Sequence, residues 1–216
     1  MRNIMKKIVW CILFASPALM NSCLGVAADI VINADGSGRI ALEYRVSQML
    51  ESMGRLDGNG RWPAIPVGRA DFERSLARIP GMRLASFSAK EAANASGDRV
   101  TSAVLEFKNT AALLAFLDNA GSHASLIQEG GKNTLRLALL DPSAAVNADL
   151  LSLLREIFAD YEISLTFTTP KNAALSITPP TVTAARLVPQ GKKVSFAIGL
   201  GELAGLENGL SIEVAW

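Results

Sequence analysis

Histidine and cysteine are scarce in this chain of 216 residues. There is one histidine, His123, and there are two cysteines, Cys11 and Cys23. So few ligands cannot supply the common zinc sets, and we expect no metal site and no cofactor. A catalytic Ser–His pair requires the two side chains to meet with a third group orienting the ring, which adjacent residues on a turn seldom do. We therefore interpret His123, within residues 121–125, as a turn residue.

An excess of charge of either sign is also lacking. The chain has 21 Lys and Arg residues against 20 Asp and Glu residues. Nucleic-acid binding requires a basic face, so the composition argues against a nucleic-acid partner. After the amino terminus, no apolar run approaches the roughly 20 residues needed to span a bilayer.

The amino terminus has the layout of a secretory signal. Arg2, Lys6 and Lys7 precede an apolar run over residues 8–20. A basic start followed by a short apolar stretch is typical of an export signal. The alternative is a buried helix of a cytosolic domain, which the three leading cations and Pro17 within the run disfavour.

Residues 19–23, Leu-Met-Asn-Ser-Cys, resemble a lipobox. Asn21 stands where a small or aliphatic residue is usual, and such relaxed forms are similar to those of spirochaete-type lipoproteins. The resemblance implies a signal peptide over residues 1–22, cleavage before Cys23 and two or three acyl chains, palmitate among them, on the new terminus. One acyl chain alone holds a protein only reversibly, whereas several give a lasting membrane anchor.

The rival is ordinary signal cleavage after Ala27 or Ala28. The number of cysteines favours cleavage before Cys23. Cys11 is lost with the signal, so Cys23 would otherwise be a lone thiol in an oxidising compartment. Lipidation of Cys23 removes that problem, and it is the interpretation we favour.

The mature chain has 194 residues and, after loss of three cations, a net charge of −2. That length suits one good-sized domain or two small ones. We predict an α+β fold of repeated β-hairpin–helix units with antiparallel sheet. Residues 23–160 form the α+β domain, and residues 161–216 form a β-rich part that packs on it or makes a small subdomain.

Alternation of apolar and polar residues predicts most of the strands. It occurs at residues 40–46, 103–107, 135–139, 163–167, 194–198 and 210–214. Apolar residues three or four apart predict helices around residues 72–79, 113–117 and 146–157. Asn109 or Thr110 would cap the second helix.

Turn residues link the strands into hairpins. Residues 35–38 (Asp-Gly-Ser-Gly), 96–98 and 130–133 have the required glycines and short polar residues. Residues 39–129 then follow the order strand, helix, strand, strand, helix, strand, which is compatible with a ferredoxin-like unit. The tail from residue 161 has no convincing helix, and residues 178–180 (Thr-Pro-Pro) interrupt its strands.

Residues 47–68 are rich in glycine and proline and predict a long loop. If the protein has a contact surface, Arg61 and Trp62 in this loop are our candidates, because Arg and Trp are enriched in binding hot spots. The alternative is that Trp62 packs the loop onto the core.

Two other motifs have structural explanations. Asn33, Asp35 and Ser37 resemble the opening of a calcium loop, but the twelfth position is Tyr44 and not glutamate, so we predict a hairpin turn. The glycines of residues 199–205 resemble a dinucleotide fingerprint, but too little chain follows for its helix and second strand. We predict a connection between two tail strands.

The chain also resembles the LppM-like envelope lipoproteins. The similarity lies in the lipobox, the early Asp-Gly-x-Gly turn, the strand 163–167 followed by Pro170, and residues 191–196 leading to a closing strand at 210–216. The resemblance implies a location at the envelope and the handling of lipid-like molecules. It carries no catalytic residue.

We therefore predict a membrane-anchored lipoprotein of the bacterial envelope, with its domain periplasmic or extracellular. It would act as a binding or scaffold module whose partners are the membrane and either an apolar ligand or an envelope protein. The alternative is an envelope hydrolase that uses carboxylates or a serine in a cleft, and we favour the non-enzymatic role. A third reading is a structural protein that engages partners through a sheet edge.

Overall fold

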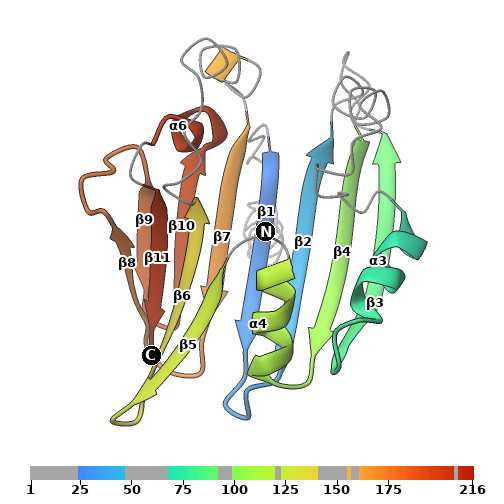
Figure 1. The fold of residues 1–216 in the computed structure, drawn as a ribbon, viewed down its shortest axis with the longest axis horizontal. Coiled ribbons are helices and arrows are strands. Elements are labelled where there is room, and N and C mark those ends of the chain that lie inside the picture. Colours follow the sequence, from blue (N-terminus) through green and yellow to red (C-terminus); the bar gives the residue numbers. More distant parts are fainter. Residues whose placement is uncertain are drawn as a thin grey trace, which may run out of the picture.

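The computed structural model describes residues 24–46, 68–91, 99–119, 123–140, 155–156, 161–206 and 209–216. Two β-sheets and short helices make up these residues. The larger sheet has seven strands in the order β3-β4-β2-β1-β7-β10-β9, and β1 lies at its centre (Figure 1). Its strands are β1 (Leu24–Ile32), β2 (Gly38–Val46), β3 (Met82–Glu91), β4 (Arg99–Phe107), β7 (Glu162–Thr168), β9 (Arg186–Gln190) and β10 (Lys193–Gly199).

Neighbours in this sheet pair antiparallel except for β1 and β7, which are parallel. The smaller sheet has four antiparallel strands in the order β5-β6-β11-β8. They are β5 (Ala124–Glu129), β6 (Lys132–Leu140), β8 (Ala174–Thr178) and β11 (Leu210–Ala215). Strands from residues 161–216 therefore contribute to both sheets and pair there with strands from residues 24–140.

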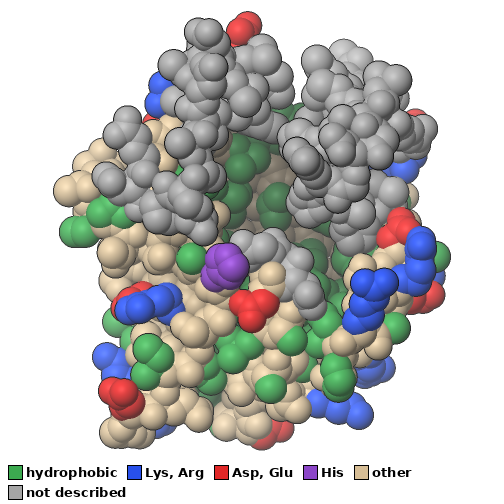
Figure 2. Space-filling view, in the orientation of Figure 1, with side chains coloured by type: hydrophobic (Ala, Val, Ile, Leu, Met, Phe, Trp, Pro, Cys, Tyr) green, Lys and Arg blue, Asp and Glu red, His purple; other side chains and the backbone are tan. Residues whose placement is uncertain are grey.

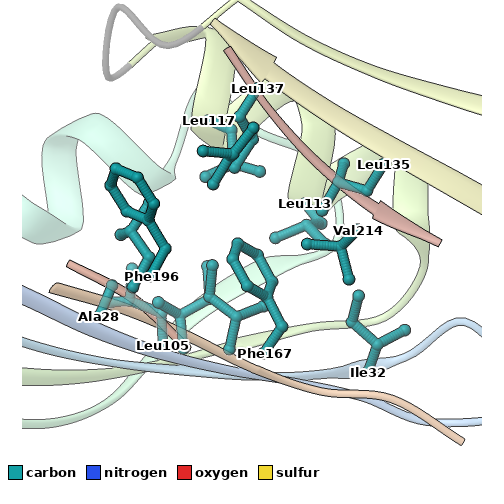
Figure 3. Packing of buried hydrophobic residues seen from close by; sticks show 14 of the residues in the cluster. Ala28, Ile32, Leu105, Leu113, Leu117, Leu135, Leu137, Phe167, Phe196 and Val214 are labelled. Carbon is teal, nitrogen blue, oxygen red and sulfur yellow. The ribbon is translucent and has the colours of Figure 1, made fainter. Parts of the chain in front are cut away.

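Three helices accompany the sheets: α3 (Arg69–Leu76), α4 (Thr110–Asn119) and α6 (Leu200–Ala204). The smaller sheet and the helices α3 and α4 lie on one face of the larger sheet (Figure 1). We call this the inner face. Side chains from α4, β6 and β11 point toward Phe167 and Leu105 of the larger sheet (Figure 3).

Side-chain size separates the two faces of the larger sheet. The inner face carries the large apolar residues, and Ile30, Ile40, Leu105, Phe167 and Val194 are at most 1% exposed. On the outer face, small and hydroxyl-bearing residues alternate with them, as the two-residue period of a strand requires. The outer-face residues of the central rows include Ala27, Ala41, Ser102, Ser164, Thr166 and Ser195.

The β1–β2 connection is a tight turn, as predicted. Asn33 N–H donates to the Ser37 carbonyl at 2.8 Å, and Gly36 adopts the positive φ of +80° that suits glycine. The Asp35 carboxylate accepts hydrogen bonds from Ser37 Oγ (2.7 Å) and Ser37 N–H (3.0 Å), which lower the pKa of Asp35. Its oxygens stabilise the turn, so the calcium-like spacing has a structural role.

The α+β fold class is confirmed, as are the predicted hairpin pairings β1–β2, β3–β4 and β5–β6. The middle segment begins as a ferredoxin-like unit would, because β4 lies between β2 and β3. Its fourth strand, β5, instead belongs to the smaller sheet, and β1 takes the place beside β2. Local pattern predicts the strands of this middle segment but not the sheet that each one joins.

Two helix predictions need comment. Asn109 does cap α4, with its Oδ1 accepting a hydrogen bond from Ala112 N–H at 2.9 Å. The expectation of a tail without helix was wrong, because the glycine-bearing connection between β10 and β11 contains the five-residue helix α6. A helix this short has too few residues to show a periodic pattern. The third predicted helix lies outside the described residues except for residues 155–156, which are helical.

Candidate functional site

The sequence-predicted site residues fall mostly where the structure gives no description. Cys23 and the contact-loop residues Arg61 and Trp62 lie outside the described residues, as does the signal peptide. His123 is described: it is exposed, immediately precedes β5 and has a positive φ of +23°. Its position agrees with a turn residue.

The inner face of the larger sheet is covered unevenly along its strands. On β1, exposure rises from 1% at Ile30 to 8% at Ala28 and 37% at Val26. On β7, Phe167 is fully buried, Leu165 is 9% exposed and Ile163 is half-buried. Among the described residues, the face is therefore closely packed at one end and more exposed at the end where β1 begins, which we call the open end.

Strand register brings the exposed residues together. Val26 lies opposite Tyr44 of β2 and opposite Ile163 of β7. In the next row along the strands, Ala28 lies opposite Leu42 of β2, which is half-buried. The apolar surface formed by Val26, Ala28, Leu42 and Ile163, which we call the inner opening, thus occupies the three central strands.

The flanks of the inner opening are packed. On one side, the ring of Phe72 on α3 lies 6.4 Å from the ring of Tyr44 and 5.7 Å from that of Phe87, centroid to centroid. On the other side, Ile198 of β10 and Leu203 of α6 are buried. Figure 2 shows hydrophobic side chains in the upper middle of this face of the molecule.

Tyr44 marks the boundary between the packed flank and the opening. Its hydroxyl and that of Thr101, the opposed residue on β4, are buried, and neither has a hydrogen-bond partner of normal geometry among the described residues. Burial, only partly offset by the neighbouring Thr101 hydroxyl, raises the pKa of Tyr44 to about 12. The surroundings are therefore of low polarity, which suits the burial of an apolar group.

Two hollows are present on the described part of the molecule. One, of about 740 Å³, lies at the closed end and is lined by Arg39, Arg83, Lys108 and Glu106 among others. Arg83 forms an ion pair with Glu106, so two cations remain in excess. A smaller groove of about 320 Å³ crosses the outer face over small residues and the carboxylates Asp29 and Glu43.

The described residues offer little to catalysis by metal or to membrane insertion. No three or more His, Cys, Asp or Glu residues among them are grouped as a metal site would require. Within the same residues, no helix is both long enough and apolar enough to cross a bilayer. The residues of the inner opening have apolar side chains, so the contact that they offer to a ligand is apolar.

The sequence pattern did not identify Val26 or Ile163 as site residues. Val26 stood within a potential cleavage region, and Ile163 within an alternating strand that predicts core. Alternation identifies which face of a strand is apolar, but it contains no signal for whether that face is covered at both ends.

No protein-family model matches the chain, and no curated protein matches it significantly. Among solved structures, the chain is similar to the folded domain of the LppM protein of Mycobacterium tuberculosis, determined by NMR. The identity is 18%, the alignment covers 88% of each chain, and the TM-score is 0.44. No ligand or activity is transferred on a similarity of this size. The LppM-like and spirochaete-type resemblances both stay predictions.

Proposed function

We propose that the protein is a lipoprotein of the bacterial envelope, tethered to a membrane through Cys23, and that its domain binds the apolar part of a ligand at the inner opening. The domain lies on the periplasmic or extracellular side of that membrane. The observation that carries the binding role is the exposure of Val26 on a sheet face whose other end is closed.

The course of β1 supports cleavage before Cys23 over cleavage after Ala27 or Ala28. From its first residues, β1 pairs with β7 on one side and with β2 on the other. Cleavage after Ala28 would remove the first five residues of this central strand, together with their backbone hydrogen bonds. Cleavage before Cys23 leaves the whole strand in the mature protein.

The environment of Val26 supports an apolar ligand. Burial of apolar surface contributes about 25 cal/mol per Å², so a ligand that covers Val26, Leu42 and Ile163 gains free energy without any charge pairing. Ligand sites are mostly apolar and commonly lie between layers, and the residues of the inner opening are apolar and lie on the sheet face that the second layer covers.

The tether is tested by the intact mass of the protein from its native host, beside a Cys23→Ala variant. We expect a chain that begins at Cys23 with added acyl mass, and partitioning into detergent that the variant loses. A mature chain that begins near Ala28 or Asp29 with no added mass would show that the protein is free of lipid.

Ligand binding is tested with a fluorescent fatty acid added to the non-acylated chain of residues 23–216. We expect saturable enhancement of fluorescence, which Val26→Asp weakens by about tenfold or more because a carboxylate in an apolar site costs well over 1.4 kcal/mol. Val188→Asp is the matched control, since Val188 is 45% exposed and lies in the edge strand β9. Equal affinities for the two variants would place the probe elsewhere, and no enhancement at all would contradict the binding role.

The hydrolase alternative is tested in the same preparation. Turnover of an acyl ester that follows enzyme concentration would favour it over a binding role. The described residues supply no observation that singles out its catalytic groups.

A further inference from the structure

One end of the seven-stranded sheet lies next to the tether. This is the end at which β1 begins. We call the strand termini at this end the Leu24 rim. The rim consists of Leu24, Val46, Glu91, Arg99, Glu162, Arg186 and Gly199. We infer that the Leu24 rim rests on the surface of the membrane that holds Cys23, so that the inner opening lies close to the lipid. The inference rests on the tether proposed above.

No linker separates the acylated residue from the first strand of the sheet. Cys23 directly precedes Leu24, and consecutive Cα atoms are about 3.8 Å apart. Leu24 is already aligned with Glu162 of β7. Gly25 is buried so closely that a Cβ there would lie 2.8 Å from the Glu162 carbonyl oxygen and 3.1 Å from Leu200 Cδ1. The start of β1 cannot detach from the sheet and act as a linker without losing these contacts.

The anchored strand, β1, is the central strand of the sheet. Three strands lie on each side of it (Figure 1). With about 4.8 Å between strands, the rim extends about 14 Å to either side of the tether. An anchor at the middle of the rim holds both halves near the headgroups, whereas an anchor at an edge strand would let the domain swing away.

The inner opening lies near the anchor. Val26 is three residues from Cys23, which is about 10 Å along a strand. Exposure of the inner face increases toward the rim, from Ile30 through Ala28 to Val26. The uncovered apolar surface therefore lies within reach of the leaflet that receives the acyl chains, and a bilayer lipid is the source of ligand that this placement fits.

The test uses the acylated protein in vesicles of phosphatidylcholine that contain a spin-labelled phosphatidylcholine as quencher. A cysteine introduced by substitution is the sole reactive thiol, because the sulfur of Cys23 is acylated and Cys11 leaves with the signal. A fluorophore is attached at Lys90→Cys on β3 or at Glu202→Cys on α6, both exposed positions near the rim. Lys192→Cys, in the turn before β10, is the matched exposed control at the opposite end of the sheet.

The labels at residues 90 and 202 are expected to lose most of their fluorescence to the quencher. The label at residue 192 is expected to keep its fluorescence, since the seven residues of β10 separate it from the rim by about 23 Å. A flexible insertion of about 20 Gly/Ser residues between Cys23 and Leu24, with a root-mean-square span of about 25 Å, is expected to restore fluorescence at residue 90 while the protein still floats with the vesicles.

The outcomes separate the inference from its premises. Equal quenching at residues 90 and 192 in a protein that floats with the vesicles overturns the docked orientation and leaves the tether intact. Unchanged quenching at residue 90 after the insertion overturns the role of the short tether. A protein that does not float overturns the tether and the orientation together, while fatty-acid binding by the non-acylated chain is measured independently of both.

Discussion

The two ends of the inner face are made of the same kinds of residue but are covered differently. At the closed end, α4 and the smaller sheet bring Leu113, Leu135 and Val214 against Phe167, and all four are at most 1% exposed. At the open end, packing comes from α3 on one flank and α6 on the other, and Val26 between them is 37% exposed. Apolar residues in one continuous sheet can therefore form core at one end and an accessible surface at the other.

The difference arises from which elements reach each end. Residues on a closed face make contacts on all sides, and their loss leaves a cavity. Residues on an open face leave apolar area in contact with water, which is unfavourable unless a ligand, a membrane or another surface covers it. The candidate site is therefore the part of the apolar sheet face that the described covering elements leave exposed.

The largest expected effect tests this contrast with the same substitution at both ends. Ile30→Ala at the closed end should lower the free energy of unfolding by about 2–5 kcal/mol, whereas Ile163→Ala at the open end should cost about 1 kcal/mol because less burial is lost and no closed cavity forms. Urea denaturation of the two variants measures both values. Similar losses would mean that the open end is packed as tightly as the closed end.

The next effect concerns alkaline pH at the flank of the opening. The ordinary pKa of tyrosine is 10.0, and that of Tyr44 is raised to about 12. Between these values the unfolded chain has lost the proton and the folded chain has kept it, so stability should fall as pH rises, by at most about 3 kcal/mol in total. Below pH 10 the stabilising contribution is fully present.

Tyr44→Phe is the control for this pH dependence. Denaturation at pH 9 and at pH 12 should show a smaller fall for the variant than for the wild type. At neutral pH the variant should lose little stability, because the hydroxyl that it lacks has no well-formed hydrogen bond. An identical fall in both proteins would assign the alkaline sensitivity to other groups.

The smallest effect separates the closed end from ligand binding. Asn109→Ala removes the cap of α4 and should cost about 1 kcal/mol of stability. Fatty-acid binding should not change, because α4 covers the closed end. Asn172→Ala, at an exposed asparagine in the turn before β8, is the matched control and should change stability by less than about 0.5 kcal/mol. A loss of binding in the Asn109 variant would show that the two ends are coupled.

Much of the fold follows from local pattern. The alternation at residues 40–46 and 194–198 predicts β2 and β10, since a large residue on every second position defines a face. The first half of β1 was missed, because Ala27 and Ala28 are weak strand formers and the segment resembles a cleavage region. β8 and β9 were also missed, because five residues with proline nearby give little periodicity.

The candidate site was less predictable than the fold. The parallel pairing of β1 with β7 joins residues about 140 positions apart, and no local signal specifies it. That pairing places Val26 beside Ile163 and so creates the inner opening. Arg61 and Trp62, chosen on residue type alone, stay a prediction.

The sequence by itself determined the α+β class, the strand faces, the hairpin turns and the expectation of an anchor at Cys23, because these depend on neighbours along the chain. Only the tertiary structure decided that β1 is the central strand, that it begins at Leu24 and that, among the described residues, the inner face is most exposed at that end. These features depend on which distant segments pair and where the covering layer stops. The physical reason is that burial is a property of the assembled layers, whereas alternation and turn chemistry are properties of a few consecutive residues.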